Sequence, residues 1–289
     1  MNQIKFIRKL VKTFLILATS FTASTQAETI DCTAITSLPA VISTQGNFCL
    51  TDKLSTSITS GNAIEITVNN VTLDLNENAL GGLAGGTATT AVGIYVNQKK
   101  NITIKNGVIR GFRTGIQFDD VSPFSASTGN VIQGILADQN REFGIWMRGS
   151  GNTVKNSQIV NTGGAPAAPD LNSRGIVMVG PGAKVRGNAV SGTFTNGTGS
   201  AFALGIVGSN ADGILIHSNS VTNESLVTNT RGIVLNNTST GAILRNNDIV
   251  NMLIGINFTD GSTGKYFNNL TTGVTTPFSG GTPIGNNNN

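Results

Sequence analysis

Short runs in which apolar and polar residues alternate follow one another along most of the chain. Two clear examples are "ITVNNVTLDL" from Ile66 and "NITIKNGVI" from Asn101. A period of two is typical of strands that bury one face, and no amphipathic helical pattern follows the first 27 residues. We therefore expect a chain built from short strands.

A Gly-Ile pair marks one strand of a repeating unit. The pair recurs at intervals of 22 to 31 residues, at Gly93-Ile94, Gly115-Ile116, Gly144-Ile145, Gly175-Ile176, Gly205-Ile206, Gly232-Ile233 and Gly255-Ile256. A repeat of this length with variable insertions is typical of a solenoid. In the unit that begins at Gly144, alternation predicts that Ile145 and Met147 point inward and Trp146 outward.

Asparagine recurs at a fixed place between two strands of the unit. Asn106, Asn156 and Asn246 take this position, and Gly187 and Ser218 replace asparagine in other units. Asparagine and glycine tolerate the left-handed backbone of a tight corner. Stacked asparagine side chains also hydrogen-bond to one another along a ladder. We interpret these residues as corners of successive coils.

The combined pattern resembles the right-handed parallel β-helix of the pectate-lyase-like superfamily. The resemblance implies an all-β fold, a single-stranded parallel β-helix solenoid of roughly 8 to 10 coils over residues 63–270, with a C-terminal tail at 271–289. Residues 28–62 resemble the N-terminal cap found in some exported β-helix proteins. A cap is needed because an open coil end exposes unpaired backbone and apolar core.

The first 27 residues have the composition of a secretory signal peptide. A basic start with Lys5 and Arg8 precedes a short apolar run, and small residues at 25–27 form a cleavage site. The leader holds four of the 19 Lys and Arg residues and no acid, so 15 charges of each sign remain. Overall basicity is thus no evidence for a nucleic-acid partner, and we expect none. No later segment reaches 18 apolar residues, so we expect no transmembrane segment in the exported chain, which would be periplasmic or extracellular.

Cys32 and Cys49 are the two cysteines of the chain. Export favours a disulfide between them, within the expected cap, and two free thiols are the alternative. We expect no metal site, because no further cysteine or neighbouring histidine accompanies the pair, and no cofactor.

Polar or glycine-rich insertions gather beside the Gly-Ile strands. Four precede such a strand, at 81–92, 162–173, 192–204 and 223–230, and one follows, at 120–129. Loops on both sides of one sheet predict a groove over it, and such a face often binds ligands. The predicted outward residues are Tyr95, Gln117 and Trp146 in one column, and Asn97, Asp119 and Arg148 in the next.

These side chains suit a sugar polymer, because aromatic rings stack on sugars and amides hydrogen-bond to them. Tyr95, Asn97, Gln117 and Trp146 are the candidate binding residues. The alternative is that Trp146 packs beneath the 162–173 loop and has a purely structural role.

A column of mostly basic residues precedes the asparagine corner. This cationic column comprises Lys105, Gln133, Lys155, Arg186, His217 and Arg245. Aligned like charges repel, which points to contact with a polyanion; the alternative is a set of solvated charges that discourages stray strand pairing. Arg174 and Arg231, directly before their Gly-Ile strands, allow the same two interpretations.

Enzymatic activity is left open. Of the segments typical of polygalacturonases, only Asp119-Asp120 is present, and adjacent strand residues point to opposite faces. We favour a non-catalytic protein that binds a polysaccharide or a surface glycan through the groove. The alternative is a lyase, epimerase or hydrolase acting on acidic glycans, which would use Asp119 and Arg148 as catalytic residues and Trp146 to hold the sugar ring. Ca²⁺ is a possible cofactor only if the protein is a lyase. A purely structural envelope protein is the third possibility.

Overall fold

The computed structural model describes residues 31–165, 172–195, 201–224 and 228–288. Backbone contacts divide the chain into Met1–Asp31 and Cys32–Asn289, and the fold is that of the second unit. The signal peptide expected at 1–27 lies outside the described residues, as do 166–171, 196–200 and 225–227 within the expected insertions.

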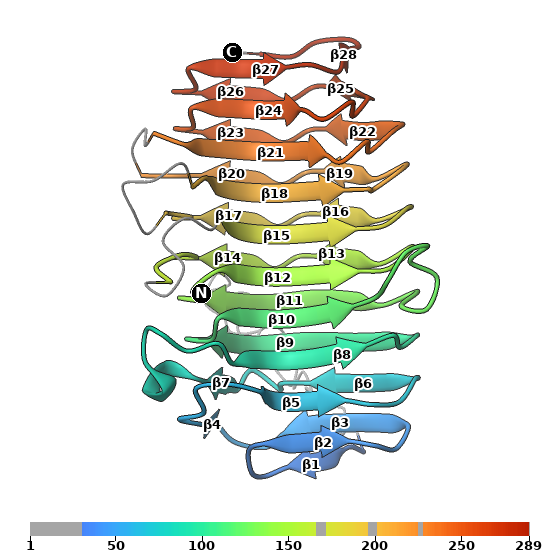
Figure 1. Cartoon of the computed structure of the whole chain (residues 1–289), viewed down its shortest axis with the longest axis vertical. Coiled ribbons are helices and arrows are strands. Elements are labelled where there is room, and N and C mark those ends of the chain that lie inside the picture. The colour runs from blue at the N-terminus through green and yellow to red at the C-terminus, as the bar shows by residue number, and fades with distance from the viewer. Residues whose placement is uncertain (1–30, 166–171, 196–200, 225–227, 289) are drawn as a thin grey trace, which may run out of the picture. The chain divides into compact units, whose positions relative to one another are not determined.

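The Gly-Ile strands form one parallel sheet, whose strands stack in chain order (Figure 1). Within the described residues it has ten strands: β2 (Ala40–Ile42), β5 (Asn62–Ile66), β8 (Val92–Asn97), β10 (Thr114–Asp119), β12 (Phe143–Arg148), β15 (Ser173–Val179), β18 (Ala203–Ser209), β21 (Thr230–Asn236), β24 (Ile254–Phe258) and β27 (Thr276–Ser279). Ten strands correspond to ten coils, which agrees with the predicted number.

The remaining strands form two further ladders that are joined through the long strands β9 and β11. The first ladder contains β1 (Thr33–Ile35), β3 (Gly46–Leu50), β6 (Val71–Asp74), β9 (Ile102–Arg110), β11 (Val131–Asp138), β13 (Thr153–Lys155), β16 (Lys184–Arg186), β19 (Leu215–His217), β22 (Ala242–Arg245), β25 (Gly264–Phe267) and β28 (Thr282–Pro283). The second contains β4 (Leu54–Ser55), β7 (Ala79–Gly81), the ends of β9 and β11, β14 (Gln158–Val160), β17 (Ala189–Ser191), β20 (Ser220–Thr222), β23 (Asp248–Val250) and β26 (Leu270–Thr272). A short 3₁₀ helix, η1 (Leu83–Gly85), lies in the loop before β8. The predicted parallel β-helix is confirmed.

Identical side chains stack inside the coils. The isoleucines that follow the repeated glycines pair from strand to strand and are fully buried, as Ile94, Ile116, Ile145, Ile176, Ile206, Ile233 and Ile256. Coils separated by one strand spacing, about 4.8 Å, bring each isoleucine into contact with the ones above and below. Burial of these columns therefore stabilises every coil through its neighbours.

The repeated glycine is required by close approach of neighbouring coils. A Cβ atom on Gly144 would lie 2.7 Å from the Gly175 carbonyl oxygen and 2.5 Å from the Ile159 side chain in the core. Equivalent contacts occur at Gly175 and Gly205. Glycine at this position faces the core together with the isoleucine that follows it, so the alternation of the strand is interrupted there.

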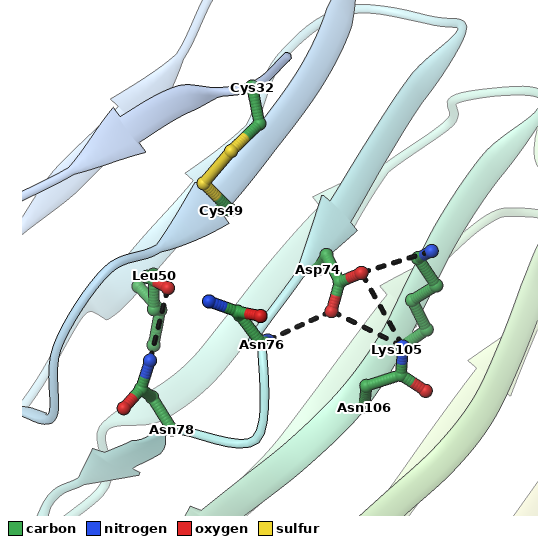
Figure 2. Close-up of a disulfide and its surroundings, with 8 residues drawn as sticks. All are labelled: Cys32, Cys49, Leu50, Asp74, Asn76, Asn78, Lys105 and Asn106. Atoms are coloured by element: carbon green, nitrogen blue, oxygen red, sulfur yellow. Dashed lines mark hydrogen bonds and ion pairs between the residues drawn. A yellow bond between two sulfur atoms is a disulfide. The ribbon is translucent and has the colours of Figure 1, made fainter. Parts of the chain in front are cut away.

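The first coil is held by a disulfide. Cys32 and Cys49 are bonded, with Cα atoms 5.8 Å apart, which confirms the predicted pair (Figure 2). The expected cap at 28–62 is itself coiled, since β2 pairs in parallel with β5, and β3 with β6. The expected tail at 271–289 continues the coils, because β27 and β28 pair with β24 and β25.

The corners have the predicted left-handed backbone. The φ angles of Asn106, Asn156, Asn246 and Ser218 lie between 49° and 56°. The buried asparagine ladder, however, occupies the next residue along the chain. Its buried members are Asn188, Asn219, Asn247 and Asn269, and the half-buried Asn287 ends it. Each of the four buried residues donates from its side-chain amide to the side-chain oxygen of the next member at 2.9 to 3.3 Å. The corner residue turns the backbone, and its successor points into the coil.

Candidate functional site

An apolar cluster covers the outer face of the ten-stranded sheet. Its buried members are Phe143, Val177, Leu204, Val207 and Val234, with Trp146, Val179 and Phe202 packed against them. It is separate from the core inside the coils. An apolar cluster on the outside of a coil forms a floor on which a ligand could rest.

A groove of about 480 Å³ opens over this cluster. It crosses β12, β15, β18 and β21, and the β10–β11 loop forms one wall. The lining residues are Asp120, Val121, Ser122, Phe124, Phe143, Trp146, Arg148, Arg174, Val177, Val179, Val207, Ser209, Asn210, Asn236 and Asn237. The groove lies over the sheet in which one was predicted, and its wall is the predicted 120–129 insertion.

The wall is fixed by a buried carboxylate. Asp120 is 2% exposed and accepts hydrogen bonds from the backbone N–H groups of Val121, Ala126 and Ser127, at 2.8, 3.1 and 2.9 Å. These bonds close the loop on itself, and charge-assisted bonds of this kind are among the stronger ones in proteins. The Asp120 carboxylate therefore serves to hold the conformation of the loop.

Two arginines of the groove lie over aromatic rings. The guanidinium carbon of Arg148 is 4.7 Å from the centre of the Trp146 ring, and that of Arg174 is 5.2 Å from the centre of the Phe143 ring. The rings of Phe143 and Trp146 pack together with centroids 4.3 Å apart. Stacking of this kind holds a guanidinium group in place while its N–H edges stay available.

Neither arginine has an ion-pair partner within 4.0 Å among the described residues. Burial lowers the pKa of Arg174, and the Glu142 carboxylate acts in the opposite direction. Arg113 binds Glu142 at the edge of the same sheet. The groove thus presents positive charge that the described residues leave unpaired.

Trp146 is partly buried, and its indole N–H has no hydrogen-bond partner among the described residues. Its lower face packs on the apolar cluster. The alternative in which residues 162–173 cover this ring involves 166–171, which lie outside the described residues. That nitrogen is itself buried, so the part of Trp146 offered to a ligand is the exposed surface of its ring.

Tyr95, Gln117, Asn97 and Asp119 lie on the same outer face but do not line the groove. Tyr95, Gln117 and Trp146 pair in register across β8, β10 and β12, as predicted. The Gln117 amide donates to the Asp119 carboxylate at 2.9 Å. Burial and the neighbouring Asp119 raise the pKa of the Tyr95 hydroxyl to about 12. These residues form a polar network beside the groove, while Arg148 lies within it.

The cationic column pairs in the predicted register, and its residues stack across β9, β11, β13, β16, β19 and β22. Lys105 differs from the others, because its ammonium group pairs with the Asp74 carboxylate at 3.0 Å (Figure 2). Arg231, directly before its Gly-Ile strand, lies 4.1 Å over the Phe202 ring and donates to Asn257 at 3.0 Å. Arg174 and Arg231 thus face the outside of the ten-stranded sheet, away from the cationic column.

Sequence reasoning missed Phe143 and Leu204. Alternation counted back from Ile145 places Phe143 inside the coil, whereas the structure places it outside with Trp146. The residues directly before each repeated glycine pair with one another, as Phe143 with Arg174 and Leu204 with Arg231. Their common position in the repeat was the available signal.

No group of three or more His, Cys, Asp or Glu residues in the described part of the chain is arranged to hold a metal ion. Among the described residues there is also no helix with the length and apolar character to cross a membrane.

Comparison with known proteins settles the family. The family described as "Right handed beta helix region" matches residues 23–190 and 92–272. The chain belongs to this family. No curated protein matches the chain.

Solved structures share the fold at low sequence identity. The enzymatically active domain of tailspike protein 2 from bacteriophage CBA120 matches with a TM-score of 0.60 and 16% identity, over 88% of this chain and 41% of that one. The Dettilon tailspike protein matches with a TM-score of 0.53 and 13% identity, over 83% of this chain and 56% of that one. The A-module of mannuronan C-5 epimerase AlgE6 from Azotobacter vinelandii matches with a TM-score of 0.50 and 12% identity, over 86% of this chain and 85% of that one. The chain spans about two-fifths of the tailspike domain that it matches.

Proposed function

We propose that this chain is an exported protein that binds an acidic polysaccharide in the groove over the ten-stranded sheet. The observation that carries the proposal is the pair of stacked, unpaired guanidinium groups of Arg148 and Arg174 in one groove. The carboxylate of Asp120, in the same groove, is buried and bonded to backbone N–H groups. A ligand that enters the groove therefore meets positive charge and aromatic surface together.

Each part of the groove has a role in this proposal. Guanidinium groups bind carboxylates through paired N–H donors, so Arg148 and Arg174 would hold the acid groups of the sugar units. The Phe143 and Trp146 rings would support the apolar faces of the sugars. Asn210, Asn236 and Asn237 at the far end offer amide donors and acceptors for hydroxyl groups.

The polar network of Tyr95, Asn97, Gln117 and Asp119 would extend the binding face. It lies on the two coils before the groove, so a polymer that runs along the coil axis would reach it after leaving Trp146. The named substrate of the epimerase neighbour is mannuronan, an acidic polysaccharide, and this agrees with the ligand class proposed. The disulfide agrees with export.

Calorimetric titration with polymannuronate and with neutral dextran tests the proposal. We expect the wild type to bind polymannuronate in preference to dextran, and the double variant Arg148→Gln, Arg174→Gln to bind polymannuronate much more weakly. The double variant Lys53→Gln, Lys100→Gln is the matched control, because it removes the same charge from exposed positions outside the groove. Equal loss in the control, or no binding of any acidic polysaccharide by the wild type, would overturn the proposal.

The same samples test for catalysis. Product unsaturation and new reducing ends are followed by absorbance, with and without added Ca²⁺. We expect binding without turnover. Turnover that disappears in Arg148→Ala or Asp119→Asn would establish instead the enzyme that the sequence left open, with those residues in its active site.

A further inference from the structure

Four basic side chains stand in line on a different face from the groove. Lys155, Arg186, His217 and Arg245 pair directly across β13, β16, β19 and β22, one per coil. We call this C-terminal part of the cationic column the cationic stripe. All four side chains are exposed or partly exposed.

The cationic stripe is not neutralised by the described part of the chain. Lys105, earlier in the same column, is paired with Asp74. Gln133 lies between Lys105 and Lys155 in the column. None of the four residues of the stripe makes an ion pair with a described residue. The acids closest in the chain are Asp212, which accepts hydrogen bonds from Thr240, and Asp248, which lies on the next ladder beyond the Asn246 corner.

The column beside the stripe adds further positive charge. Thr153, Lys184, Leu215 and Ile243 pair in register two residues before the stripe positions, and Lys265 continues this column in the next coil. Neither column contains an acidic residue over these coils. Over these four coils the two columns therefore add Lys184 to the four basic residues of the stripe, and Ile243 is exposed beside them (42%).

Like charges placed opposite one another on neighbouring strands destabilise a sheet. The effect is visible at His217, where burial and then the flanking Arg245 and Arg186 lower the pKa of the imidazole. The corresponding columns of the ten-stranded sheet over these coils carry valines, so stacked cations are not a requirement of the fold. A repulsive arrangement that the fold does not need points to a ligand that relieves it.

We propose that the cationic stripe binds a linear acidic polysaccharide, independently of the groove. The four side chains in successive coils, three of them charged at neutral pH and the fourth the His217 imidazole, span about 14 Å at about 4.8 Å per step, so the chain of a linear polyanion can lie along them. Proteins that bind single-stranded nucleic acid combine a basic track with aromatic stacking surfaces. Between Thr153 and Arg245 the two columns carry no Phe, Tyr or Trp, and a single Phe267 follows Arg245 in the next coil. The track thus has no series of stacking surfaces, which favours a polysaccharide over a nucleic acid.

The test uses the full exported chain carrying Arg148→Gln and Arg174→Gln, so that binding in the groove does not contribute. Dextran sulfate is titrated at several salt concentrations, with uncharged dextran for comparison. We expect dextran sulfate to bind with an affinity that falls as salt rises, because association releases counterions. Adding Arg186→Gln and Arg245→Gln should weaken binding at low salt about tenfold and make the salt dependence shallower.

The matched control adds Lys53→Gln and Lys100→Gln instead, which removes the same charge from exposed positions outside the stripe. Equal weakening in the control, or no binding of dextran sulfate at any salt concentration, would overturn the proposal. Tighter binding of single-stranded DNA or of anionic lipid vesicles than of dextran sulfate would overturn the polysaccharide assignment. The melting temperature of the stripe variant should stay constant or rise, and a fall would indicate a structural role instead.

Discussion

The Arg148 guanidinium lies over the Trp146 indole at 4.7 Å, and both side chains face the groove. The two residues are therefore coupled: the ring positions the charge, and the charge covers part of the ring. Trp146 is the single tryptophan of the chain, so tryptophan fluorescence reports on the surroundings of this one ring.

Replacement of Trp146 by alanine should weaken the binding of an acidic polysaccharide about tenfold, because both the stacking surface and the support of Arg148 are lost. Titration calorimetry measures the affinity. Trp146→Phe is the control and should retain most of it. In the wild type, bound polysaccharide should protect the indole fluorescence from acrylamide quenching. Unchanged quenching in the presence of saturating ligand would place the ligand elsewhere.

Replacement of Asn219 by alanine should destabilise the fold by about 3 kcal/mol, because it leaves several buried groups without partners. The Asn219 side chain accepts from the Asn188 amide and donates to Asn247 and to the Val185 carbonyl. Urea unfolding followed by circular dichroism gives the free energy. Asn246→Gly, at the adjacent exposed corner, is the control and should cost under about 1 kcal/mol, because glycine adopts its left-handed backbone. Similar losses in both variants would contradict a special role for the buried ladder.

Loss of the disulfide should destabilise the N-terminal coil. Cys32 and Cys49 are 17 residues apart, and a closed loop of this size contributes about 3 kcal/mol in the chain-entropy model. In the double variant Cys32→Ser, Cys49→Ser, we expect hydrogen exchange to rise first in β1 and β3. Wild-type protein treated with dithiothreitol should behave alike. Uniform exchange along all coils would show that the disulfide does not act locally.

The stability of the fold should depend on pH through His217, the single histidine of the chain. Its folded-state pKa lies below the ordinary value of 6.5. Between those two pKa values the unfolded chain binds more protons, so stability falls as the pH drops through 6.5 and the loss is complete below the folded-state pKa. Relative to wild type, His217→Gln should therefore be more stable at pH 5 than at pH 8, as measured by urea unfolding. An identical difference at both pH values would exclude this coupling.

The fold could be predicted because every repeat unit must satisfy the same physical constraints on its buried positions. Ile145 and its counterparts fill the coil, and the glycine before each has no room for a side chain. The register of Gln117 and Trp146 followed from the same alternation. Phe143 was missed because the inward-facing glycine next to it interrupts the period of two, which hydrophobicity alone does not reveal.

The sequence did not predict the finer features of the site, because the hydrogen-bond and ion-pair partners that define them leave no pattern in the sequence. Asp120 bonds to backbone N–H groups of its own loop, which any residues would offer. The pairing of Lys105 with Asp74 was hidden for another reason. The coil that contains Asp74 begins with Ala63-Ile64 in place of Gly-Ile, so it did not enter the alignment of units. The asparagine ladder was predicted one residue too early because the corner and the ladder both use asparagine.

The parallel pairing of the coils has a consequence for how this protein could change in length. Each of the four coils between β12 and β22 contributes one strand to the groove and one to the cationic stripe, and it pairs only with the coils before and after it. Duplication or deletion of a whole coil would therefore move both surfaces by the same step of about 4.8 Å and preserve the register of each. The number of coils sets the length of both surfaces, so the lengths of polymer recognised on the two faces would increase or decrease together.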